Sequence, residues 1–329
     1  MDILNFKVCP LGQTVIRYQV PLDVFNIINH IYETKYPTLP PANRQLVGKI
    51  EKEHSLFFGG ADNNKMKPHN LLPQNVLQWF HEVMKHYLDF SGMAVLAHRG
   101  GALEANENTL ESFIYANDIG CDYIETDVQV SSDGIPYIFH DEDLSRIVGQ
   151  KKYFNELSSA EINALTIFKN QKIPTLQSVL DALPDTLFQI DVKTDDVAIP
   201  ALKVIESCNE LNRVCIASFS SKRLEVVRSF YPDICISMGP NEIIKTLLGS
   251  FGLYSKPVHG DCLQVPIYHY GIKIVTQRFI NYVHSKGLKI IVWTINDAKT
   301  MKKLISMGVD GIITDKPKEL KGLLIKINT

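Results

Sequence analysis

The chain has 329 residues, of which 45% are hydrophobic and 21% charged, a composition typical of a folded globular protein with one large domain and room for a smaller one. Its 34 basic and 36 acidic side chains give a formal net charge of −2, and it contains no run rich in lysine or arginine. A nucleic-acid partner is therefore not expected.

Residues 1–92 form the first predicted region. They lack the pattern of a signal peptide, and no apolar run in the chain approaches the roughly 18 to 20 residues that cross a membrane, so we expect a cytoplasmic protein. Apolar residues recur at helical spacing in Pro21–Thr34 and Gln74–Phe90, with a polar, proline-bearing stretch between them. We predict a small, mainly helical N-terminal domain that packs internally, docks on the rest of the chain or binds a partner, including a second copy of the chain.

From residue 93 to 329 the pattern changes to short β-rich runs that alternate with amphipathic stretches. The eight predicted strands are Ala94–His98, Tyr123–Val130, Leu187–Lys193, Val214–Phe219, Ile234–Met238, Cys262–Ile267, Ile290–Ile295 and Gly311–Thr314. Helices are predicted at Thr109–Ile119, Pro200–Leu211, Lys222–Phe230, Glu242–Leu248, Gln277–Lys286, Ala298–Met307 and Lys318–Ile325. Such alternation indicates a parallel sheet, because parallel strands need long crossovers.

Eight strand–helix repeats over about 240 residues predict an α/β fold of the (β/α)8 TIM-barrel type. The competing interpretation is an open, doubly wound sheet. That fold usually carries a glycine-rich phosphate loop after its first strand, whereas here the first strand ends in His98-Arg99-Gly100-Gly101. The six cysteines are scattered without a CxxC pair, so we expect reduced, mostly buried thiols and no zinc site built on them.

Polar residues gather at the predicted carboxyl ends of the strands, where barrels of this type place their active sites. His98 and Arg99 end the first strand, and Glu125 and Asp127 lie two apart on the second, so they share one strand face. Asp191 and Lys193 repeat this spacing on the third strand. The remaining members of the set are Glu107, Asn108, His140, Ser218, Trp293, Asn296, Thr314 and Asp315.

These residue types suit phosphodiester chemistry. Three carboxylates without a nearby cysteine favour one hard divalent cation, Mg²⁺ or Ca²⁺. A metal together with Arg99 and Lys193 would offset phosphate charge, while two histidines provide an acid and a base near neutral pH. Taken singly, each residue has a plain structural explanation, such as an ion pair inside the barrel or, for Glu107, stabilisation of a helix start.

In these residues the chain closely resembles the glycerophosphodiester phosphodiesterase family of metal-dependent (β/α)8 barrels. The matching motifs cover residues 94–317. They are His98-Arg99-Gly100, Glu107-Asn108-Thr109, Glu125-x-Asp127, Asp133-Gly134, His140-Asp141, Ile173-Pro174-Thr175-Leu176, Asp191-x-Lys193, Ser218-Phe219, Trp293-Thr294-x-Asn296 and the segment Gly308 to Pro317.

The resemblance implies roles for these positions. Glu125, Asp127 and Asp191 would bind the metal, although the family usually has glutamate where this chain has Asp191. His98 and His140 would be the catalytic acid and base. Arg99, Lys193 and Trp293 would contact the phosphate and line the pocket, and Glu107, Asn108, Ser218 and Asn296 would support them.

The resemblance implies hydrolysis of a small-molecule glycerophosphodiester to an alcohol and sn-glycerol 3-phosphate. Two alternatives stay open. The first is phospholipase D-like or C-like activity on a lysolipid at the same site, with peripheral membrane contact through aromatic residues of Gly249–Tyr254 and of residues 262–271. The second is a non-catalytic module that binds a phosphate ligand and uses the N-terminal domain for interaction and homo-oligomer assembly.

Overall fold

The computed structural model describes residues 3–8, 16–21, 87–90, 92–232 and 234–328 in two compact units, Met1–Val83 and Met84–Thr329. In the first unit, strands β1 (Ile3–Val8) and β2 (Ile16–Pro21) pair antiparallel, a hairpin that we did not predict. The predicted helix at 21–34 falls outside the described residues, except for its first residue. Of the predicted helix Gln74–Phe90, only Tyr87–Phe90 is described, and these four residues form a turn and irregular chain instead.

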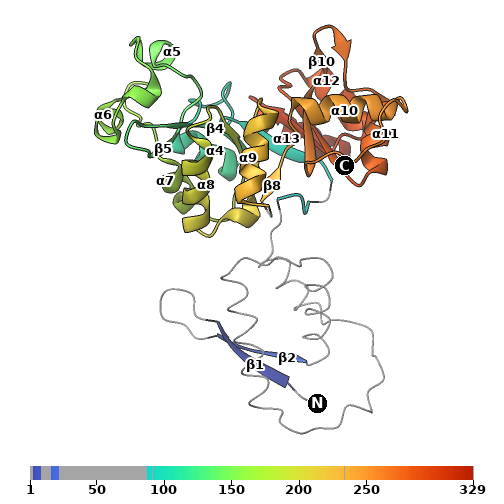
Figure 1. The fold of residues 1–329 in the computed structure, drawn as a ribbon, viewed down its shortest axis with the longest axis horizontal. Coiled ribbons are helices and arrows are strands. Elements are labelled where there is room, and N and C mark those ends of the chain that lie inside the picture. Colours follow the sequence, from blue (N-terminus) through green and yellow to red (C-terminus); the bar gives the residue numbers. More distant parts are fainter. Residues whose placement is uncertain (1–2, 9–15, 22–86, 91, 233, 329) are drawn as a thin grey trace. The chain divides into compact units, whose positions relative to one another are not determined.

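The second unit is a parallel β-barrel with all eight predicted strands (Figure 1). These are β3 (Ala94–His98), β4 (Tyr123–Val130), β6 (Leu187–Val192), β7 (Val214–Ala217), β8 (Cys235–Ile236), β9 (Cys262–Pro266), β12 (Lys289–Trp293) and β13 (Gly311–Thr314). They are ordered β8-β7-β6-β4-β3-β13-β12-β9. A parallel bridge between Ser237 and Cys262 joins the two ends of this sheet, so the barrel prediction is confirmed and the open sheet is excluded.

Helices follow the strands as predicted. They are α4 (Leu110–Asp118), α8 (Ala198–Ser207), α9 (Ser221–Phe230), α10 (Pro240–Ser250), α11 (Gln277–Ser285), α12 (Ala298–Met307) and α13 (Pro317–Asn328). Side chains cap the amino ends of α4, α9, α11 and α12. Thr109 accepts a hydrogen bond from the Ser112 amide at the start of α4, and Asp297 caps α12 in the same way. The apolar face of each helix packs on the barrel; α11, for example, buries Phe279, Ile280 and Val283.

Two insertions depart from the simple repeat. Between β4 and α7 (Leu176–Ala182), the helix of that repeat, the chain adds β5 (Pro136–Ile138), α5 (Ser145–Val148), η1 (Phe154–Glu156) and α6 (Ser159–Ala164). This insertion has its own apolar cluster, with Tyr137 and Phe139 packed against Phe154. The second insertion is a hairpin of β10 (Tyr268–His269) and β11 (Ile272–Lys273). The α5–α6 region and the β10 hairpin lie on opposite sides of the barrel unit (Figure 1).

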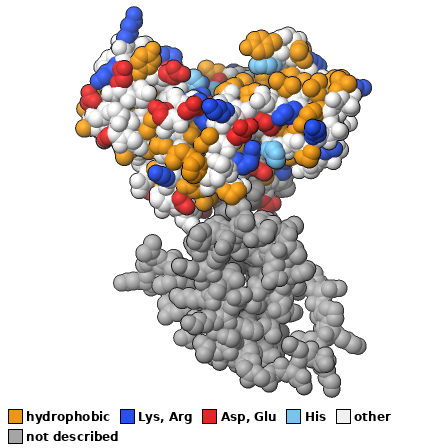
Figure 2. All heavy atoms as spheres, in the orientation of Figure 1, with side chains coloured by type: hydrophobic (Ala, Val, Ile, Leu, Met, Phe, Trp, Pro, Cys, Tyr) orange, Lys and Arg blue, Asp and Glu red, His pale blue; other side chains and the backbone are white. Residues whose placement is uncertain are grey.

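The main core lies between the strands and the surrounding helices, and a second, smaller core fills the barrel interior. Interior members alternate along the strands, as Tyr123 and Glu125 do on β4, because successive side chains point to opposite faces of a strand. Acidic and basic side chains are interspersed on the face shown in Figure 2, in keeping with the nearly balanced charge. Among the described residues, no helix is long and apolar enough to cross a membrane.

Candidate functional site

The strands bring the sequence-predicted polar residues together at one end of the barrel. His98, the last residue of β3, is in register with Glu125 on β4. Two residues further along β4, Asp127 is in register with Asp191 on β6. All three carboxylates are buried, at 8%, 1% and 6% exposure. Burial of this much charge is costly unless cations are close.

His98 is held by Asp315, a member of the polar set to which the sequence analysis gave no role. Its Nδ1 lies 2.5 Å from Oδ1 of Asp315, which directly follows β13, and its Nε2 lies 3.8 Å from Oε2 of Glu125. Asn296 donates from Nδ2 to Oδ2 of Asp315 at 2.6 Å, and its Oδ1 accepts from the Asp315 amide. Burial alone would lower the pKa of His98, but Glu125 and Asp315 outweigh it and raise the pKa. Asn296 therefore acts by fixing Asp315.

Arg99 and Asn108 adopt left-handed backbone conformations, with φ of 51° and 54°. These conformations turn both side chains toward β4. Nη1 of Arg99 donates to Oε1 of Glu107 at 3.0 Å, and its Nε lies 3.4 Å from Oδ2 of Asp127 without hydrogen bonding. Nδ2 of Asn108 donates to Oδ2 of Asp127 at 3.0 Å, and Oδ1 accepts from Thr126. Asp127 is thus fixed from one side by two groups of the loop after β3.

Lys193 holds Asp127 and Asp191 from the other side. Its Nζ lies 2.8 Å from Oδ1 of Asp127 and 2.7 Å from Oδ2 of Asp191. Burial alone would raise the pKa of Asp127, but Lys193 and Arg99 outweigh it and lower the pKa. Burial raises that of Asp191. Burial and the charge of Asp127 raise the pKa of Glu125 to about 7. Neighbouring positive charge therefore outweighs the effect of burial on the pKa of Asp127, but not on the pKa of Glu125 or Asp191.

This donor set fits a hard cation. Oδ1 of Asp191 is buried and has no hydrogen-bond partner, and the raised pKa of Glu125 reports a carboxylate without enough neighbouring positive charge. Carboxylate oxygens without sulfur or imidazole are the ligands that Mg²⁺ and Ca²⁺ prefer. Glu125, Asp127 and Asp191 can therefore supply oxygen ligands to such an ion.

His140 follows β5 and is fixed in the same way as His98. Its Nδ1 lies 2.6 Å from Oδ1 of Asp141. Arg146 of α5 donates from Nε to Oδ2 of Asp141 at 2.7 Å and from Nη1 and Nη2 to both oxygens of Glu107. Although burial raises the pKa of Asp141 and of Glu107, Arg146 lowers both. Arg146 thereby ties the inserted segment to the loop after β3.

An open cavity of about 570 Å³ adjoins this end of the barrel, lined by residues of the insertion, including His140, Arg146 and Tyr153, and by Lys193. On the other side of Lys193, Phe219 packs edge-to-face on Trp293 with ring centroids 5.7 Å apart. The Lys193 ammonium lies 5.9 Å from the centroid of Phe219, whose ring is 68% exposed. The charged centre is thus bordered by a polar cavity and an aromatic pair.

Among the candidate residues, Ser218 has a structural role. Oγ of Ser218 donates to the backbone oxygen of Val192 at 3.1 Å and accepts from Arg223, so its hydroxyl fixes the ends of β6 and β7. Three further residues contact the candidates, although the sequence analysis gave them no role: Asp315, Asp141 and Arg146. Asp315 and Asp141 belong to motifs that match the family, but only the structure shows that each contacts a histidine. No motif contains Arg146.

Comparison with known proteins points to one family. The profile of the glycerophosphoryl diester phosphodiesterase family matches residues 98–319. A relative from Mycobacterium tuberculosis, named "Probable glycerophosphodiester phosphodiesterase 2", is 33% identical over 246 residues, 73% of this chain and 93% of the relative. Human lysophospholipase D GDPD1 is 26% identical over 269 residues, 70% of this chain and 85% of the relative.

Solved structures agree as well. The crystal structure of a glycerophosphodiester phosphodiesterase from Thermotoga maritima superposes with a TM-score of 0.57 at 25% identity, covering 72% of this chain and 99% of that one. Our expectation of the family, of its barrel fold and of a hydrolase of phosphoric diesters is confirmed by these matches. The chain therefore belongs to the glycerophosphoryl diester phosphodiesterase family.

Proposed function

We propose that this protein hydrolyses glycerophosphodiesters to an alcohol and sn-glycerol 3-phosphate, with His98 and His140 as the acid–base pair and one divalent cation, Mg²⁺ or Ca²⁺. One observation carries the assignment. Each histidine has its Nδ1 on an aspartate, which leaves both Nε2 atoms available. Nε2 of His98 lies 3.8 Å from Glu125, and the His140 ring interacts electrostatically with Asp127 and Asp191. The family description and the name of the Mycobacterium relative support the substrate class.

The proposed roles follow from the contacts. Glu125, Asp127 and Asp191 would hold the cation, which when bound polarises the phosphate oxygens. Arg99 and Lys193 would then contact the phosphate from either side of Asp127. Glu107 and Asn108 position Arg99 and Asp127, and Asn296 positions Asp315.

The reaction breaks the bond between phosphorus and the oxygen of the leaving alcohol. An oxygen nucleophile, either water or the neighbouring glycerol hydroxyl, forms a new bond to phosphorus and gives its proton to Nε2 of one histidine. Nε2 of the other histidine donates a proton to the leaving alkoxide. Attack by the glycerol hydroxyl gives a cyclic phosphate first, which water then opens with the proton transfers reversed.

A direct test is ³¹P NMR of glycerophosphocholine with the full-length protein and added Mg²⁺ or Ca²⁺. We expect signals of glycerol 3-phosphate, and no turnover by His98→Ala or His140→Ala. His284→Ala is the matched control, because His284 also pairs with an aspartate, Asp310, but outside the site. The assignment fails if a folded His98→Ala/His140→Ala double variant turns over, and binding without turnover by the unmodified protein would favour the non-catalytic alternative.

A second candidate is phospholipase D-like or C-like activity on a lysolipid at the same centre. The exposed ring of Phe219 and the β10–β11 hairpin, where Tyr268 is 60% and Tyr270 is 93% exposed, offer apolar surface for an acyl chain or a membrane. The human relative is named for such an activity. Release of choline from lysophosphatidylcholine, with no product from glycerophosphocholine, would establish this candidate in place of the first.

Residues 1–92 are proposed to form a domain of their own that directs assembly. The compact unit Met1–Val83 is the supporting observation. Light scattering on the full chain and on a chain that starts at Met84, which keeps Tyr87 in the barrel interior, tests it. Equal oligomeric states in the two would contradict it.

A further inference from the structure

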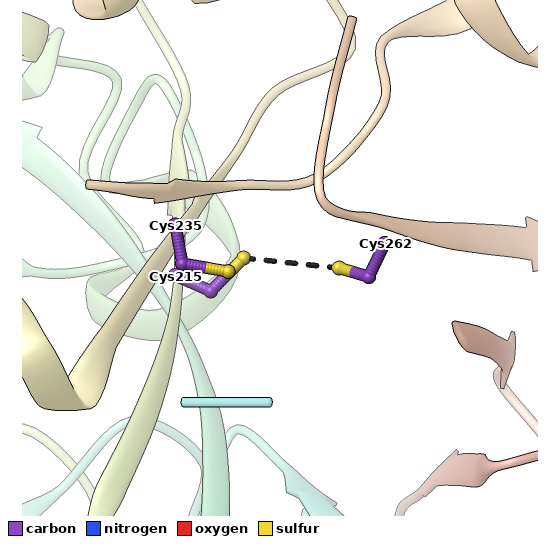
Figure 3. A group of neighbouring side chains, drawn as sticks. All are labelled: Cys215, Cys235 and Cys262. Atoms are coloured by element: carbon purple, nitrogen blue, oxygen red, sulfur yellow. Dashed lines mark hydrogen bonds between the residues drawn. The ribbon is translucent and has the colours of Figure 1, made fainter. Parts of the chain in front are cut away.

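Three cysteines that are far apart in the sequence meet inside the barrel (Figure 3). They lie near the amino ends of their strands, opposite the end that carries the carboxylate cluster. Cys215 is the second residue of β7, and Cys235 and Cys262 are the first residues of β8 and β9. Their sulfur atoms all lie within 4.8 Å of one another, and their side chains are 0%, 4% and 0% exposed. Barrel closure therefore builds a preformed thiol cluster that no local sequence spacing reveals.

We propose that Cys215, Cys235 and Cys262 bind one monovalent copper ion in trigonal sulfur coordination. Thiol sulfur is a soft ligand and selects soft cations such as Cu(I) and zinc over the hard cations of the phosphate site. The ion would join β7, β8 and β9, the part of the barrel in which the sheet is closed by a single bridge between Ser237 and Cys262.

The distances suit such an ion. Sγ of Cys215 and Sγ of Cys262 are 4.0 Å apart (Figure 3). A trigonal ion with metal–sulfur distances of about 2.3 Å separates its sulfurs by about 4.0 Å. A disulfide would need a sulfur–sulfur distance of about 2.05 Å, so the cysteines here are free thiols.

The number of ligands separates copper from zinc. Structural zinc sites are almost always four-coordinate, and no histidine, aspartate or glutamate in the described part of the chain joins the three sulfurs. The Tyr87 hydroxyl and the Gln264 amide have another partner. Tyr87 donates from its hydroxyl to Oε1 of Gln189 at 2.9 Å, and Gln264 donates to the same oxygen. A cation satisfied by three sulfurs is therefore the better fit.

Cysteine binds a metal as its thiolate, so each thiol of the cluster that becomes a ligand releases one proton to the solvent. A monovalent cation offsets the charge of one such thiolate in the apolar interior.

The test is anaerobic titration of the reduced full-length protein with Cu(I) against the chromogenic chelator bathocuproine disulfonate. Because the sulfurs are buried, Cu(I) is added both to the folded protein and during refolding from guanidinium. We expect one ion per chain to be withheld from the chelator and the ion to raise the unfolding temperature. X-ray absorption of the loaded protein should show three sulfur neighbours.

The variant Cys235→Ser should lose both the bound ion and the rise in unfolding temperature. Cys121→Ser is the matched control, because Cys121 is equally buried but lies outside the cluster, and Cys9→Ser checks the one cysteine outside the described residues. The proposal is overturned if the chelator removes all copper from the unmodified protein under both loading conditions. It is equally overturned if Cys121→Ser or Cys9→Ser loses the ion, or if the absorption spectrum shows fewer than three sulfur ligands.

Discussion

Nδ1 of His98 lies 2.5 Å from Oδ1 of Asp315, and the same arrangement recurs at His140, whose Nδ1 lies 2.6 Å from Oδ1 of Asp141. An ionised carboxylate only accepts hydrogen bonds, so in both pairs Nδ1 is the donor. Each neutral ring then carries its free lone pair on Nε2. Two aspartates thus set the tautomer of both proposed acid–base residues.

We expect Asp315→Asn to reduce kcat by about 10²- to 10⁴-fold, the range typical of lost acid–base catalysis, with little change in KM. Asp315 accepts from His98 on one oxygen and from Nδ2 of Asn296 on the other. An amide at this position has only one acceptor, so its NH₂ group must face one of the two donors. Steady-state kinetics on glycerophosphocholine measures the effect.

The control for this variant is Asp310→Asn, because Asp310 accepts from Nε2 of His284 at 2.8 Å outside the site. It should leave kcat unchanged. An Asp315→Asn variant with normal kcat would mean that His98 needs no anchoring carboxylate.

Arg146 should make the stability of the protein dependent on pH in the acid range. It lowers the pKa of both Glu107 and Asp141, so its stabilising effect is fully present above their unfolded pKa values, about 4. The effect is lost as the pH falls through the lower folded values. We expect Arg146→Met to lower the free energy of unfolding by about 1 kcal/mol at pH 7, with the difference vanishing in stronger acid.

Urea denaturation of both proteins between pH 7 and pH 3 measures this difference. Lys152→Met is the control, because Lys152 pairs with Glu161 at 3.0 Å on the exposed surface of the same insertion. A difference between Arg146→Met and the unmodified protein that stayed constant down to pH 3 would show that Arg146 acts through packing and not through its charge.

Chelation should abolish turnover, and Mg²⁺ or Ca²⁺ should restore it. We expect Asp191→Asn to raise the metal concentration needed for half-maximal activity by about 10- to 100-fold, because the unpartnered Oδ1 loses its charge. Asp191→Glu keeps the charge and should stay near the unmodified value. Asp195→Asn is the control, since the Asp195 side chain is 82% exposed and pairs with Arg223. An unchanged metal response in Asp191→Asn would exclude Asp191 as a ligand.

The barrel could be predicted because its signal repeats along the chain. Every predicted strand is present, although β6 ends at Val192 and β8 covers only Cys235–Ile236. The insertion between β4 and β6 was not recognised, because α5 and α6 have only four and six residues and too few turns to show a period. The hairpin of β1 and β2 was missed as well, in a region where we expected helices.

The sequence predicted only the parts of the site that depend on residues close together in the chain. The i, i+2 spacing places Glu125 and Asp127 on one face of β4. Lys193 follows β6 directly and contacts both Asp127 and Asp191. The contact of His98 with Asp315 joins residues 217 positions apart, and that of Arg146 with Glu107 spans 39. Such pairs are set by the barrel closure and by the insertion, and no periodicity in the sequence records them.

Gly100 should be far less tolerant of a side chain than Gly134, although both have left-handed backbones, with φ of +83° and +86°. A Cβ at Gly100 would meet Oγ of Ser112 at 2.3 Å, whereas one at Gly134 meets nothing within 4 Å. We expect Gly134→Ala to cost about 1–2 kcal/mol through the backbone alone. Gly100→Ala should cost about 1–3 kcal/mol more through overpacking. It should also lower activity, because Gly100 adjoins Arg99 and Ser112 caps α4. Equal thermal unfolding of the two variants would contradict the close approach of Gly100 to α4.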